Sequence, residues 1–161
     1  MKTLKYTLLA LALLSIFAKC QKDPIPDPNS IYFQCKLNGN LYIPDNCANC
    51  AQADLIGDTT LILRGNSGFA TLGMLIKDLS KIKTGQYFLN HLDGRVADYK
   101  NSTLTYDRYF TTLTYTGLLT ISSLDKLNRI IQGTFYFKAY NVYRNDSVTI
   151  TDGKFRLKYK I

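Results

Sequence analysis

Residues 129–140 read RIIQGTFYFKAY, and they give the clearest local signal in the chain. After Gly133, apolar side chains at Phe135, Phe137 and Ala139 alternate with more polar ones. Successive side chains of a β-strand point to opposite faces, so this alternation predicts a long strand with one buried face. Such a strand needs partners, and the rest of the sequence supplies them.

The C-terminal residues 154–161, KFRLKYKI, show the same alternation. It places four cations on one side of a second strand, and these are Lys154, Arg156, Lys158 and Lys160. We interpret this side as a solvated strand face or as a charged sheet edge that opposes aggregation. Binding of an acidic glycan or an anionic headgroup is the alternative. The Asp152-Gly153 pair predicts a turn that joins this strand to another at 147–151.

The remaining β-rich segments are short and are separated by turn signals such as Asn38-Gly39. We expect strands at 31–37, 41–43, 59–64, 69–76, 86–89, 103–106 and 111–122. Helical periodicity is confined to 46–55 and 77–82, where a turn or two of helix is expected. The predicted fold class is therefore all-β, an antiparallel β-sandwich or flattened barrel of about 8–10 strands with little helix.

The N-terminus has the features of a bacterial export signal. Two lysines precede an apolar run at 8–18, which is shorter than the roughly 20 residues that a membrane-spanning helix needs. The segment up to Cys20 resembles a bacterial lipoprotein signal, which implies that Cys20 becomes the acylated first residue of the mature protein. Ala18 matches the small residue typical of this signal, whereas Lys19 departs from it. An ordinary secretory leader is the alternative.

Residues 20–30 are expected to form a tether, because three prolines between positions 24 and 28 lack amide donors and favour extended backbone. Gln21-Lys22-Asp23 resembles a short export signal of surface lipoproteins in the Bacteroidetes, with a solvated linker as the alternative. We divide the chain into a signal peptide (1–19), a lipidated Cys20 with a Pro-rich tether (20–30) and a single β domain (31–161). The expected location is the outer membrane, to which the protein is lipid-anchored, and the sequence leaves open which leaflet carries it and whether it faces the cell surface.

Several segments of the β domain carry a family resemblance. They are FQCKLNG at 33–39, YIP at 42–44, NRIIQGTFYF at 128–137 and VTITDGKFRL at 148–157. Together they resemble a family of Bacteroidetes lipoproteins of unknown function, DUF6252. The resemblance implies a small extracytoplasmic β domain on a lipid anchor. It implies no activity and no catalytic residues.

Three cysteines remain once Cys20 is assigned to lipid: Cys35, Cys47 and Cys50. Cys47 and Cys50 form a C-x-x-C motif, but a thioredoxin-like site would need a βαβ setting that the sequence does not predict. A zinc site made with His91 is also considered, and it is not favoured because His91 has no ligand-spaced neighbour. We expect a disulfide, as is usual outside the cytoplasm, and no metal. The pairing stays open: Cys35 with either partner, or Cys47 with Cys50.

No arrangement of residues in the sequence predicts catalysis. The chain has no glutamate, and most of its aspartates stand at predicted turns, where they satisfy backbone groups. A glycosidase would need two carboxylates facing each other across a groove. The sequence contains no Gly-x-Ser-x-Gly motif and no phosphate-binding loop. We expect a protein that is not an enzyme and that binds no cofactor.

Charge and aromatic content favour a binding role. The net charge is +8, and removal of a leader with three lysines lowers it to +5. The cations do not cluster in one loop, and an extracytoplasmic location argues against nucleic acid. Several of the 12 tyrosines fall on the polar side of predicted strands, where exposed rings stack on sugars or form protein interfaces. We expect a lipid-anchored binding module for a glycan or protein of the cell envelope. The alternative is an accessory or structural envelope lipoprotein with no small ligand.

Overall fold

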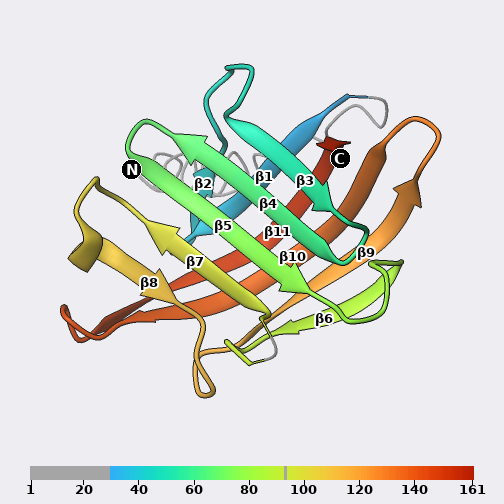
Figure 1. Ribbon diagram of the computed structural model, residues 1–161. Coiled ribbons are helices and arrows are strands. Elements are labelled where there is room, and N and C mark those ends of the chain that lie inside the picture. Colours follow the sequence, from blue (N-terminus) through green and yellow to red (C-terminus); the bar gives the residue numbers. More distant parts are fainter. Residues whose placement is uncertain (1–29, 93) are drawn as a thin grey trace, which may run out of the picture.

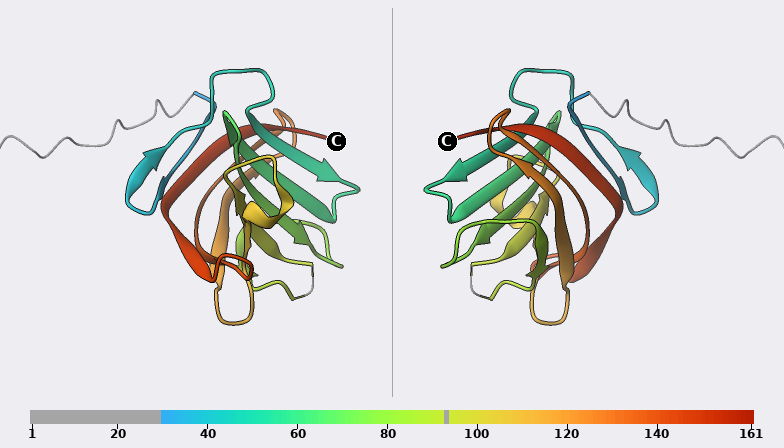
Figure 2. Two further views of the ribbon diagram at one scale, coloured as in Figure 1. Left: turned by 90° about the vertical axis from the view of Figure 1, so that its left-hand side faces the viewer. Right: turned by 90° about the vertical axis from the view of Figure 1, so that its right-hand side faces the viewer.

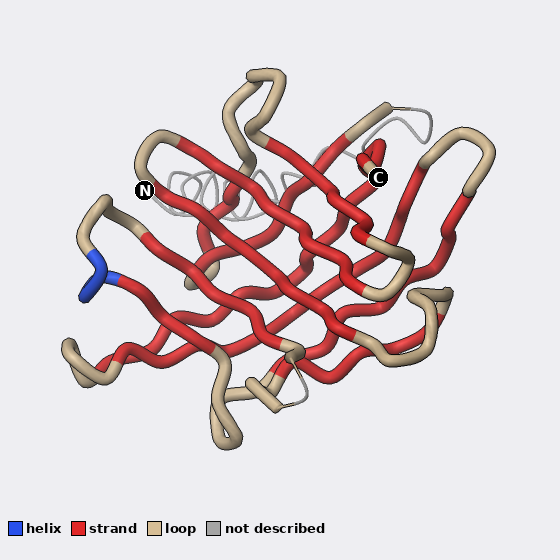
Figure 3. Tube along the Cα trace, viewed as in Figure 1, coloured by secondary structure: helices blue, strands red, loops and turns tan. Residues whose placement is uncertain are grey.

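The computed structural model describes residues 30–92 and 94–161, so the leader and Cys20 lie outside the described residues. Strands make up most of it, with one 3-10 turn, η2 (Thr105–Asp107) (Figure 3). No helix in these ranges is long and apolar enough to cross a membrane. The strands are β1 (Tyr32–Leu37), β2 (Asn40–Tyr42), β3 (Ala51–Ile56), β4 (Thr60–Ser67), β5 (Ala70–Lys77), β6 (Gly85–Leu89), β7 (Val96–Lys100), β8 (Arg108–Phe110), β9 (Gly117–Asp125), β10 (Ile130–Asn141) and β11 (Asp146–Lys160).

All eleven strands belong to one sheet that closes on itself. The strands β11-β3-β4-β5-β7-β8-β10 form a ring, because β10 pairs with β11 as well as with β8. The β1–β2 pair extends from β11, and the β9–β6 pair extends from β10. Two layers face each other across the core, with β3, β4, β5, β7 and β8 in one and the long strands in the other (Figures 1 and 2). The all-β prediction is confirmed, and the form it takes is the flattened barrel.

The antiparallel pair β10–β11 is the longest ladder of the barrel. It runs from Ile130, opposite Lys158, to Asn141, opposite Asp146. Along β10 the side chains alternate between buried and exposed over most of the strand, as the RIIQGTFYFKAY pattern predicted. The Phe135 ring lies 5.2 Å from Phe33 and 6.3 Å from Phe155, measured between ring centroids. These aromatic side chains fill the centre of the barrel and hold its long strands together.

The predicted turn at Asp152-Gly153 is wrong, since both residues lie inside the continuous strand β11. The ladder with β10 shifts register between Phe135 and Phe137, so β11 has one extra residue there. Asp152 has a φ of 54°, which is typical of a β-bulge with its first residue in the left-handed region. Asp-Gly suits such a bulge as well as it suits a hairpin, and the sequence pattern cannot distinguish them.

The predicted number of strands is too low, because three short strands were missed. The helix expected at 46–55 is instead a turn followed by β3, whose Ala53 and Leu55 are buried against β4. Strands β7 and β8 were not predicted, and the strand expected at 103–106 is replaced by bends and η2. In the segment expected as a strand at 111–122, the strand β9 begins only at Gly117.

One parallel pairing departs from the antiparallel prediction. The end of β11 leaves β1 and pairs with β3, with Tyr159 opposite Ala53 and Lys160 opposite Asp54. This contact closes the ring at one corner, and the pairing of Tyr140 with Phe110 closes it at the other. Strand β11 therefore has neighbours on both sides, so its cations do not mark a sheet edge. The other interpretation, a solvated strand face, is confirmed, because Lys154, Lys158 and Lys160 are exposed.

At Gly133 the strands β9, β10 and β11 pack so closely that no room is left for a side chain. A Cβ at this position would lie 2.0 Å from the Thr120 carbonyl oxygen and 2.8 Å from Cζ of Phe155. Because the nearest obstacle is backbone, the strand itself would have to move. We expect Gly133→Ala to lower the free energy of unfolding by about 3 kcal/mol in urea denaturation, as overpacked core substitutions do. The exposed substitution Ser123→Ala is the control, with an expected change within about 0.5 kcal/mol. Equal stability of the two variants would contradict this strand packing.

Candidate functional site

A groove of about 560 Å³ opens at the end of the barrel where β8 meets β10. Its walls come from the β6–β7, β8–β9 and β10–β11 connections, which are far apart in the sequence. Figure 1 shows the β8–β9 connection at the bottom of the barrel, whereas β1 begins at the top, and Figure 2 agrees. The groove and the point where the chain enters the fold are therefore at opposite ends.

The floor of the groove is aromatic. Tyr140 and Phe110 are direct partners across the β8–β10 corner. The Arg108 guanidinium lies over the Phe110 ring, 4.6 Å from its centroid, and His91 meets the same ring edge-on at 6.5 Å. Tyr115 stacks on Tyr140 with 4.9 Å between ring centroids. Ring faces of this kind bind apolar groups, sugar rings or cations.

The rim of the groove is apolar and open to solvent. Leu113, Val142 and Tyr143 line it and keep 69%, 72% and 79% of their surface exposed. Leu92 adds a fourth exposed apolar side chain from the β6–β7 connection. Large side chains scattered singly over a surface are ordinary, but a cluster around a hollow is typical of an interaction site.

The β10–β11 connection is held in shape by Asn141, which is fully buried. Its side-chain amide donates to the Tyr106 carbonyl oxygen at 2.7 Å. Its carbonyl oxygen accepts from the backbone amides of Tyr143 and Arg144, at 2.9 and 3.1 Å. An asparagine that satisfies the amides two and three residues on is typical of an ordered turn. The exposed side chains of this turn are therefore presented on a fixed backbone.

A buried carboxylate fastens the same connection to η2. Asp107 accepts from the Ser102 hydroxyl and from the guanidinium of Arg144, whose Nε lies 2.7 Å from Oδ1. The hydrogen bond from Ser102 and the neighbouring Arg144 hold the pKa of the Asp107 carboxyl below its usual value. Arg144 follows Tyr143 directly, so this ion pair braces the groove rim.

The β8–β9 connection forms the opposite wall and is also ordered by side chains. Thr112 Oγ1 accepts from the amides of Thr114 and Tyr115, and the Thr112 amide donates to the Tyr115 carbonyl at 2.7 Å. The buried Thr111 hydroxyl accepts from the Ala97 amide at 3.0 Å and ties the wall to β7. Both walls are thus pre-formed, which lowers the entropy cost of binding.

Acid should weaken the interaction of Asp107 with Ser102 and Arg144. A carboxyl whose pKa is lowered by folding stabilises the fold above its usual pKa, 3.8 here, and loses this contribution as the pH falls through the lowered value. We expect Asp107→Asn to have a lower melting temperature than wild type at neutral pH. The difference should shrink below about pH 4 as the wild-type carboxyl is protonated. Circular dichroism melts across pH measure this, with Asp54→Asn as the control. A difference in melting temperature that does not change with pH would contradict a stabilising role for the ionised Asp107 carboxylate.

The comparisons with known proteins give a family and no relative. Residues 29–157 match the family model described as Domain of unknown function (DUF6252). The chain belongs to this family. The resemblance to DUF6252 predicted from the sequence is confirmed. Searches of curated proteins and of solved structures found no significant match to the chain.

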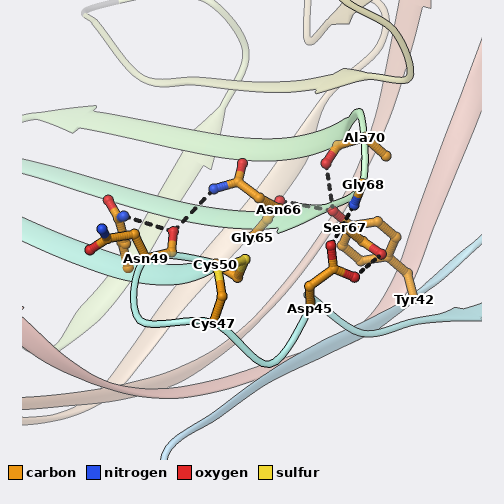
Figure 4. Close-up of a disulfide and its surroundings, with 11 residues drawn as sticks. Tyr42, Asp45, Cys47, Asn49, Cys50, Gly65, Asn66, Ser67, Gly68 and Ala70 are labelled. Carbon is orange, nitrogen blue, oxygen red and sulfur yellow. Dashed lines mark hydrogen bonds between the residues drawn. A yellow bond between two sulfur atoms is a disulfide. The ribbon is translucent and has the colours of Figure 1, made fainter.

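In this DUF6252 domain the C-x-x-C motif is a disulfide, Cys47–Cys50 (Figure 4). It lies in the β2–β3 connection, which Figure 1 shows at the opposite end of the barrel from the β8–β9 connection that lines the groove. The surrounding loop is tied to the β4–β5 hairpin, because the Asp45 carboxylate accepts from Ser67 Oγ at 3.0 Å and from the Gly68 amide at 2.6 Å. Of the pairings left open by the sequence, the structure has the one that closes a short loop. These contacts indicate that the motif holds the loop in place.

The third cysteine of the DUF6252 domain, Cys35, is free and buried in the core. Burial raises the pKa of the Cys35 thiol to about 12, so the thiol stays protonated at neutral pH. Within residues 30–92 and 94–161 no group of three or more metal-ligating side chains comes together. His91 lies in the groove, at the other end of the barrel from Cys47 and Cys50, so the arrangement considered for zinc is not assembled.

The groove of the DUF6252 domain could be predicted only in part from the sequence. The sequence pointed to tyrosines as a class, and of these Tyr140 and Tyr143 line the groove and Tyr115 stacks beside it, whereas Tyr99 and Tyr109 are buried in the core. The aliphatic rim was missed, because those residues stand in connections where no period is expected. A usable signal was available in Val142-Tyr143, two large apolar residues between the polar ends of a predicted loop.

Proposed function

We propose that the protein is a lipid-anchored extracytoplasmic binding module that holds an apolar segment of an envelope protein in its groove. The observation that carries this proposal is the exposed apolar rim over an aromatic floor. Recognition sites of this kind bury large side chains of the partner in a hollow, surrounded by contacts that exclude water. Nothing in the proposal requires catalysis, a metal or a cofactor.

The anchor is the second part of the proposal. It rests on the lipoprotein-like leader and on Cys20, ten residues before the described fold begins at Ser30. The position of the groove supports it, because a chain held by its N-terminus would present the far end of the barrel away from the membrane (Figure 2). A partner in the surrounding medium or in a neighbouring envelope protein would then meet the groove first.

A protein segment is favoured over a glycan by the character of the rim. Leu113 and Val142 are aliphatic and offer no hydrogen bonds to sugar hydroxyls. A glycan remains the second candidate because of the stacked pair Tyr115–Tyr140, with Lys138 Nζ 5.2 Å from the Tyr115 centroid. Aromatic faces beside a cation are a suitable platform for an acidic sugar.

A random-peptide display library, selected against the immobilised protein, tests the groove. We expect enrichment of peptides with aliphatic or aromatic residues. The double variant Val142→Ser/Tyr143→Ser should bind these peptides at least tenfold more weakly, since each lost anchor is worth about 1 kcal/mol or more. The matched control Phe69→Ser/Leu127→Ser removes two exposed apolar side chains outside the groove and should leave binding unchanged.

A glycan array probed with the same three proteins, the wild type and the two double variants, separates the two candidate ligands. Sugar binding that the Val142→Ser/Tyr143→Ser variant loses, without peptide enrichment, would overturn the protein-segment proposal in favour of a glycan. No groove-dependent binding to either library would contradict the binding role and favour an accessory or structural envelope protein.

A further inference from the structure

Basic side chains gather at the end of the barrel where the chain enters the fold. A hollow of about 430 Å³ is lined there by Ile31 together with Arg129, Lys158 and Lys160. The chain brings them together in two ways. The Tyr159 amide donates to the Arg129 carbonyl oxygen at 2.8 Å, and alternation along β11 puts Lys158 and Lys160 on the same face. We call these three cations and Ile31 the basic entry surface.

The cations of this surface are not neutralised within the fold. Asp54 stands opposite Lys160 in the β3–β11 ladder, and Asp125 stands opposite Ile130 beside Arg129. Neither carboxylate forms an ion pair with Arg129, Lys158 or Lys160 among the residues that the structure describes. These basic groups therefore remain available to an anionic partner outside the fold.

We infer that the basic entry surface lies against anionic headgroups of the bilayer that holds the Cys20 anchor. This inference rests on the proposed function, since it needs the anchor. Ser30 is ten positions after Cys20, so covalent geometry limits the distance between their Cα atoms to roughly 35 Å. The first described residue already touches β11, because Arg156 Nη1 donates to the Ser30 carbonyl oxygen at 3.4 Å. The tether therefore joins the fold beside strand β11, which carries Lys158 and Lys160.

The basic entry surface would also fix the orientation of the domain relative to the membrane. An N-terminal lipid alone would let the domain rotate about its tether. Each basic residue near an anionic bilayer strengthens association by about fivefold, and the effect falls off within a Debye length. Arg129 precedes the start of β10 and Tyr140 stands near its end, about 35 Å further along the strand. Docking of the basic entry surface would therefore hold the groove well away from the bilayer.

Lysine labelling of the full-length acylated protein in vesicles tests the inference. The protein is reconstituted in phosphatidylcholine with or without phosphatidylglycerol, labelled with an amine-reactive reagent, and mapped by mass spectrometry. We expect Lys158 and Lys160 to react severalfold more slowly in the anionic vesicles, and high salt should remove this protection. Lys138, near the groove end of β10, should react equally in both. Arg129→Gln should reduce the protection, whereas the control Lys83→Gln should leave it unchanged.

The outcomes separate this inference from the proposed function. Equal reactivity of Lys158, Lys160 and Lys138 in both vesicle types, on protein whose intact mass shows acyl chains, would overturn the inference and leave the anchor in place. Protection that is the same with and without phosphatidylglycerol would also overturn it, because headgroup charge would then play no part. An intact mass without acyl chains on Cys20 would overturn the proposed anchor, and this inference with it.

Discussion

The pairing of β10 with β11 is the interaction on which the rest of the structure depends. Both strands extend far enough to pair with strands of the other layer. Tyr140 of β10 pairs with Phe110 of β8, and Tyr159 of β11 pairs with Ala53 of β3. Without this ladder the eleven strands would form one open sheet, with the facing edges of β10 and β11 unpaired. The ladder also positions both proposed sites, because the β10–β11 connection at one end lines the groove and the other end carries the basic entry surface.

The length of these strands requires a bulge. A long, strongly twisted pair must bend to stay in contact with a core, and an extra residue in one strand increases both bend and twist. Asp152 and Gly153 provide that residue in β11. Gly153 has no alternative there, since a Cβ would lie 2.4 Å from the Phe135 carbonyl oxygen. The close approach of β10 and β11 at the bulge thus depends on the absence of a side chain at Gly153.

Much of the fold follows from the sequence, because alternation along 129–140 and 154–161 reports directly which face is buried. The strand β3 could not be predicted in this way. Its sequence, AQADLI, has residues of low β-propensity at the start, and its conformation comes from pairing with β4 and β11. The groove was harder to predict than β3, since its walls come from three connections that only the closed barrel brings together. Local patterns carry no information on such long-range contacts, nor on which cysteines pair.

In the proposed arrangement the barrel stands on a bilayer with its groove pointing outward. Fluorescence quenching by headgroup spin-labelled lipids tests this in vesicles with one fluorophore on Tyr143→Cys or on Ile161→Cys. Labelling at one site is feasible, because Cys47 and Cys50 are bonded to each other and Cys35 is buried. We expect this orientation to give strong quenching of the label at 161 and little at 143. Equal quenching at both positions, or stronger quenching at 143, would contradict it.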